Sequence, residues 1–73
     1  MKIAYYPETD SMYIDLSSKG SVNSIEISPG VVLDYNSEGN ITSIDIDNAR
    51  KKLDLQELIL SKIPVNKHTI AAW

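Results

Sequence analysis

The chain has 73 residues, a net charge of −3 and no cysteine. We expect a single small domain over residues 1–73, since so short a chain buries only roughly 60% of its surface and cannot build a second core. The lack of cysteine excludes a disulfide framework and a thiolate zinc site. Small cores of this kind often gain stability by association, so self-association is expected.

The charges are unevenly distributed along the chain. Residues 1–49 carry eight acids and two lysines, whereas residues 50–73 carry five bases and two acids. An acidic body repels phosphates, so nucleic acid is not an expected partner. The N-terminal sequence lacks the long apolar run of a secretory signal, and no segment approaches the roughly 20 apolar residues that span a bilayer. We therefore expect a cytoplasmic protein without a membrane partner.

Alternating apolar and polar residues predict five short strands in the first two-thirds of the chain. Turn-forming residues separate them, among them Pro7–Asp10, Ser28–Gly30 and the hairpin-length loop Asn36–Asn40. The pattern is typical of an antiparallel β meander, over residues 1–49, with one apolar and one wet face. Each of the last four strands places a carboxylate on the wet face. These carboxylates are the candidate partner-binding face: Asp15, Glu26, Asp34 and Asp45.

The periodicity changes after Ala49. Asp54 and Glu57 fit a capping pair at a helix start, apolar residues then recur at helical spacing, and Pro64 ends the element. Within residues 50–64 we expect one short helix, near 54–62, whose stripe of Leu55, Leu58 and Ile59 packs on the apolar face. The fold class is therefore α+β, and residues 65–73 form a tail or a short sixth strand.

No catalytic residues are predicted. The one histidine, His68, lies in the C-terminal tail, and neither a G-x-S-x-G motif nor a glycine-rich phosphate loop is present. No pair of groups with opposed proton-transfer roles can be named, so we do not expect an enzyme or a cofactor.

The segment Asp34–Asp45 follows the calcium loop of an EF-hand in outline, with oxygen donors at positions one, three and five and glycine at six. However, Asp45 is shorter than the usual bidentate glutamate, and the flanks alternate with period two, whereas an EF-hand is flanked by helices. We therefore predict a hairpin here and no metal site.

The chain resembles a family of short, mostly prokaryotic proteins known as the domain of unknown function 2283 family. The resemblance covers about residues 1–49. Tyr6 stands where the family more often has aspartate, and Asp45 where it more often has glutamate. The family has no assigned catalytic residues, but some relatives are described as antitoxins encoded beside small toxins, which implies a protein partner. The matching residues are Met1, Lys2, Ile3, Tyr5, Pro7, Glu8, Asp10, Tyr13, Ile14, Leu16, Pro29, Gly30, Val31, Asp34, Tyr35, Gly39, Ile44, Asp45 and Ile46.

Three functional classes remain open. The first is a protein-interaction module, antitoxin-like, whose acidic face or free edge strand binds a basic partner. The second is a structural homodimer without a dedicated ligand. The third is a small metal- or ligand-binding domain that uses the acidic face. We favour the first.

Overall fold

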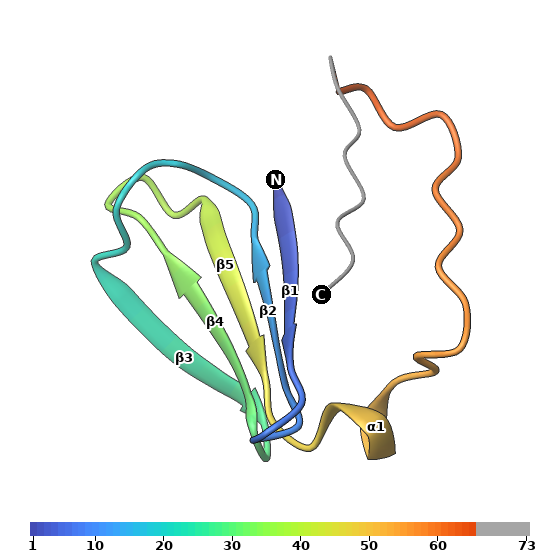
Figure 1. The fold of residues 1–73 in the computed structure, drawn as a ribbon. Helices are drawn as coiled ribbons and strands as arrows, with labels where there is room; N and C mark the ends of the chain where they lie inside the picture. Colours follow the sequence, from blue (N-terminus) through green and yellow to red (C-terminus); the bar gives the residue numbers. More distant parts are fainter. Residues whose placement is uncertain (66–73) are drawn as a thin grey trace.

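The computed structural model describes residues 1–65 and shows one antiparallel sheet followed by a short helix (Figure 1). This confirms the predicted α+β class of an antiparallel sheet with one short C-terminal helix. The alternatives for the tail, and His68, fall on residues 66–73, outside the described part of the chain. The elements are β1 (Lys2–Tyr6), β2 (Ser11–Asp15), β3 (Asn23–Ser28), β4 (Val31–Tyr35), β5 (Ile41–Ile46) and α1 (Ala49–Lys52).

The strand order across the sheet is β1-β2-β5-β4-β3. Two hairpins link β3, β4 and β5 as consecutive neighbours, and β5 then pairs with β2 of the N-terminal hairpin. The β2–β3 connection, residues 16–22, is held at both ends. The Leu16 N–H donates to the Thr42 carbonyl at 2.8 Å, and the Val22 N–H donates to the Tyr35 carbonyl at 2.9 Å. Because β2 pairs with β5 and not with β3, the last strand in sequence, β5, is the central strand of the sheet.

The register separates the two faces of the sheet. Residues directly opposite each other on neighbouring strands share a face. One such row crosses all five strands and is wholly apolar, and a second row beside it contains Tyr5, Met12, Ile46 and Val31. We call this side the apolar face. The residues of its first row are Ile3, Ile14, Ile44, Leu33 and Ile25.

The hydrophobic core is very small. Among the described residues, the buried apolar side chains are Ala4, Ile46 and Ala49. Ile14, Ile44 and Leu33 lie on the three inner strands but are only half-buried. In a two-layered domain these positions would be covered, so the described part of the chain is a single layer.

Helix α1 lies at the end of the sheet next to the β1–β2 turn (Figure 1). Its N-terminus is fixed by that turn, because the Ala49 N–H donates to the Asp10 carbonyl at 2.8 Å and the Arg50 N–H donates to the Asp10 carboxylate at 3.1 Å. Leu53 is already extended, so the helix ends at Lys52. No helix within residues 1–65 has the length and apolar character to cross a membrane.

The prediction of a helix near 54–62, within residues 50–64, is therefore wrong: the helix is shorter and lies earlier. The Asp54 carboxylate accepts the N–H of Gln56 at 3.1 Å, as a helix cap would, but the chain does not continue as a helix. A helix of two turns is marginal without tertiary packing. That packing is absent, since Leu58 and Ile59 are 63% and 75% exposed. Figure 1 shows this segment running away from α1 and apart from the sheet.

Candidate acidic interaction face

The strand register brings the four predicted carboxylates to the face opposite the apolar one. One cross-strand row has the order Lys2, Asp15, Ser43, Asp34 and Ser24. The adjacent row runs from Ala4 through Tyr13, Asp45 and Val32 to Glu26. We call this side, with Asp15, Glu26, Asp34 and Asp45, the acidic face. Alternation along the strands was sufficient to predict it.

Asp34 is held in its ionised form by two serines. The Ser24 hydroxyl from β3 donates to Oδ1, and the Ser43 hydroxyl from β5 donates to Oδ2 at 2.6 Å. The hydrogen bond from Ser24, followed by that from Ser43, lowers the pKa of Asp34 below its ordinary value. Ser43 is itself fully buried. Because Ser24 lies on β3 and Ser43 on β5, the Asp34 carboxylate ties together the three strands β3, β4 and β5.

Asp45 is in the opposite electrostatic situation. Partial burial raises the pKa of Asp45, and the negative charges of Asp34 and Asp47 raise it further. Its ionised form is therefore disfavoured by its neighbours. A positive charge placed beside it would relieve that repulsion.

Within residues 1–65, no ion pair neutralises the carboxylates of the acidic face. Among residues 1–65 the one ion pair joins Arg50 to Asp10, away from this face. Asp15 lies opposite Lys2 in the register, but the hydrogen bond its side chain makes is with the N–H of Ser17, at 3.3 Å. Glu26 is exposed on the edge strand β3. The face is thus available to a cationic partner.

Asp10 forms a second polar cluster, which the sequence analysis did not single out. Its Oδ1 accepts hydrogen bonds from the Tyr5 hydroxyl at 2.8 Å and from Arg50 Nε at 3.3 Å, in addition to the Arg50 N–H. Desolvation acts to raise the pKa of Asp10, but the hydrogen bonds from Tyr5 and Arg50 outweigh it and the pKa is lowered. The same hydrogen bond to Asp10 raises the pKa of Tyr5. The contacts with Arg50 fix α1 to the β1–β2 turn, and the contact with Tyr5 ties that turn to β1, so the cluster is structural.

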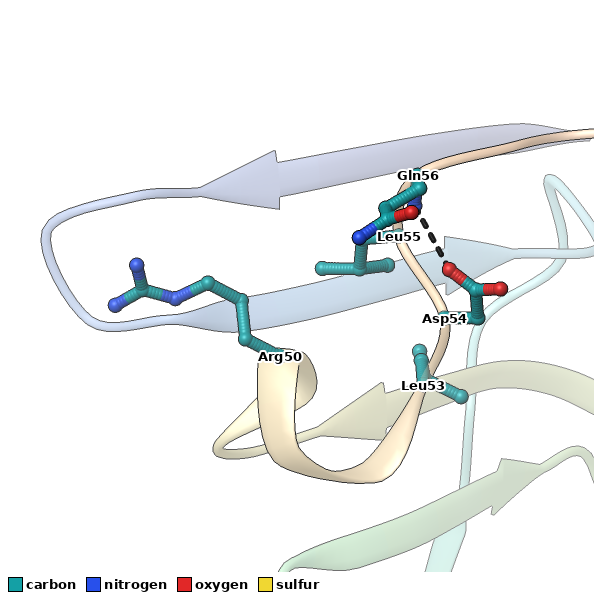
Figure 2. A pocket seen from close by; sticks show the side chains of 5 residues that line it. All are labelled: Arg50, Leu53, Asp54, Leu55 and Gln56. Atoms are coloured by element: carbon teal, nitrogen blue, oxygen red, sulfur yellow. Dashed lines mark hydrogen bonds between the residues drawn. The ribbon is translucent and has the colours of Figure 1, made fainter.

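A hollow of about 300 Å³ lies beside α1. Figure 2 shows Arg50 reaching from the helix while Leu53, Asp54, Leu55 and Gln56 come from the extended chain that follows. The Asp54 carboxylate is already used by the Gln56 N–H, and Arg50 Nε by Asp10. The Asp54 carboxylate and Arg50 Nε therefore already serve local structure.

The calcium-loop segment is a hairpin between β4 and β5, as predicted. The side-chain oxygen of Asn36, a ligand in the calcium template, instead accepts the N–H groups of Glu38 and Asn40 at 3.0 and 3.1 Å. Asn36 is buried and acts as the centre of the turn. Within the described residues, no three side chains of metal-binding type are grouped together.

The sequence model of one protein family matches residues 2–50, and its description reads "Protein of unknown function (DUF2283)". The match covers most of the chain and all five strands. The protein belongs to this family, which confirms the resemblance drawn from the sequence. No curated protein and no solved structure matches the chain.

Proposed function

We propose that this member of the DUF2283 family is a non-catalytic protein-interaction module, and that its acidic face binds a basic protein. The observation that supports the proposal most directly is the register, which gathers Asp15, Glu26, Asp34 and Asp45 on one side of the sheet. Like charges collected on a sheet are unfavourable for stability alone. A binding role would explain why the sheet keeps these mutually repelling carboxylates.

The electrostatics favour a partner that carries positive charge. The raised pKa of Asp45 reflects burial first and then repulsion by Asp34 and Asp47. Lysine or arginine side chains approaching this region would relieve the repulsion. Complementary charge of this kind chiefly speeds association and selects partners. An antitoxin-like inhibitor that covers the phosphate-binding surface of an RNA-cleaving protein is one form of this activity.

The experiment is capture of partners from native lysate with the full chain at low and high salt. The test variant is Glu26→Gln/Asp45→Asn, which removes two charges from the acidic face without touching the Asp34–serine network. The matched control is Glu8→Gln/Glu57→Gln, which removes the same charge from positions outside the strands.

We expect wild type and control to capture the same basic proteins at low salt, and the test variant to lose them. High salt should weaken capture by wild type and control, since screening reduces the attraction between exposed charges. Identical capture by all three proteins at both salt concentrations would contradict the proposal.

A further inference from the structure

We propose that the apolar face of the sheet is the contact surface for the same face of a second copy of this chain. The two sheets then form a β-sandwich whose core is shared between the copies. This inference uses the side of the sheet opposite the acidic face, so it does not depend on the proposed function.

The first argument is the exposure of the apolar face. Its outer positions, Ile3 on β1 and Ile25 on β3, are 44% and 53% exposed, and the inner positions of the same row are only half-buried. Contiguous apolar surface of this kind on a soluble protein marks an interaction site. Sheets bury such a face against another layer, and the described residues supply none.

The second argument is the area that a stable dimer needs. The apolar face extends over two cross-strand rows, the second of which contains Tyr5, Met12, Ile46 and Val31. A standard interface buries roughly 800 Å² on each partner. Contact along one strand edge or one row would not reach that area, so a dimer formed here uses both rows of the face.

The third argument is charge. The two apolar rows carry no charged side chain, and the charges of Asp10 and Arg50 beside Tyr5 are paired with each other, so bringing two such faces together buries no unpaired charge. The opposite face carries four carboxylates, and two of those faces would repel each other. Charge thus selects the apolar sides as the contact between copies, with both acidic faces outward.

The fourth argument is size, and it favours a second copy over the chain's own C-terminal segment. Five strands span about 19 Å, and strands of this length run roughly 17–20 Å. One extended segment, such as residues 53–65, covers a strip only about one or two strands wide. A second sheet, packed about 10 Å away, matches the face in both dimensions.

The test is sedimentation of the full chain at micromolar concentration. Wild type should sediment at twice the 8.1 kDa chain mass. The test variants Ile3→Glu and Ile25→Glu place a charge on the apolar face, at positions that are exposed in a single chain. Each should raise the dimer dissociation constant on the order of 100-fold, because the interface would bury that charge unpaired. Tyr6→Glu, on the acidic side of β1, and Ile59→Glu, in the C-terminal segment, are the matched controls and should remain dimeric.

A monomeric wild type would overturn the proposal, as would a dimer that Ile3→Glu and Ile25→Glu leave intact. Dissociation by Ile59→Glu would also overturn it, since the C-terminal segment would then be the occupant. A measurement on the unmutated protein guards against variants that fail to fold. In a mixture of labelled and unlabelled wild-type chains, we expect intermolecular nuclear Overhauser effects between methyl groups of Ile14, Leu33 and Ile44. Contacts of these methyl groups with Leu58 or Ile59 alone would reject the proposal.

Discussion

Asp34 and Asp45 face the same solvent on neighbouring strands, yet removing their charges should change stability in opposite directions. Asp34 accepts hydrogen bonds from Ser24 and Ser43, and its pKa is lowered by them. The amide introduced by Asp34→Asn would retain one acceptor oxygen, so this variant loses about one charge-assisted bond. We expect a loss of about 1 kcal/mol in the free energy of unfolding at pH 7, at the modest end of the range for such bonds because the site is accessible to water.

For Asp45→Asn we expect a gain of about 0.5 kcal/mol at pH 7, since relief of like-charge contacts on a sheet lies in this range. The pH dependence follows from the two pKa directions. The stability that Asp34 contributes is present above the ordinary carboxyl pKa of about 4 and is lost as the pH falls through its lowered value. Asp45 has a raised pKa, so wild type loses stability as the pH rises from about 4 through that raised value. Asp45→Asn should therefore converge on wild type below about pH 4, and Asp34→Asn should approach wild type only as the pH falls through the lowered pKa of Asp34.

The assay is urea unfolding followed by far-UV circular dichroism at pH 7 and pH 3. All proteins are compared at one concentration, because self-association makes apparent stability depend on concentration. Glu38→Gln, at an exposed turn position, is the control for the change in net charge and should stay within about 0.5 kcal/mol of wild type. An Asp34→Asn variant as stable as wild type at pH 7, or an Asp45→Asn variant less stable than wild type, would refute the reasoning.

Three further predictions concern the scaffold. Asp10→Ala should destabilise the protein, because the Arg50 N–H loses its acceptor, and amide exchange of the α1 residues should rise; unchanged exchange there would contradict the anchoring role. Gly30 has φ +76° and an added Cβ would lie 3.2 Å from the Asp47 Cβ, so Gly30→Ala should cost roughly 1–2 kcal/mol in urea unfolding. Gly20→Ala, in open space, is the control, and equal effects of the two would reject the argument. Leu58→Ala should change stability by less than about 0.5 kcal/mol, because the side chain is 63% exposed, and a loss above about 2 kcal/mol would show that it packs.

The sheet was predictable from the sequence because its signals are local. Period-two alternation assigned each residue to a face, and turn chemistry placed the hairpins, including the one centred on Asn36. The β2–β5 pairing was not predictable in the same way, since no local signal specifies which distant strand fills the gap beside β2. The acidic face could nevertheless be predicted, because alternation alone decides the face whatever the strand order.

The C-terminal region shows where local signals fail. Asp54 and the spacing of Leu55, Leu58 and Ile59 follow the rules for a helix, but helix formation depends on packing that this segment lacks. The actual helix is capped by Asp10, which is 40 residues earlier in the chain. A cap supplied across such a distance leaves no pattern near the helix itself.

The two proposed surfaces should respond to salt in opposite ways, and this separates them in one experiment. Contact between apolar faces brings two chains of net charge −3 together, so added salt should leave dimerisation unchanged or strengthen it slightly by screening their repulsion. Binding of a basic protein to the acidic face should weaken as salt rises, because its attraction is screened. Sedimentation and partner capture, each measured across the same salt series, therefore report on different sides of one sheet. If both associations weakened together with salt, one charged surface would account for both and the division of roles between the faces would be wrong.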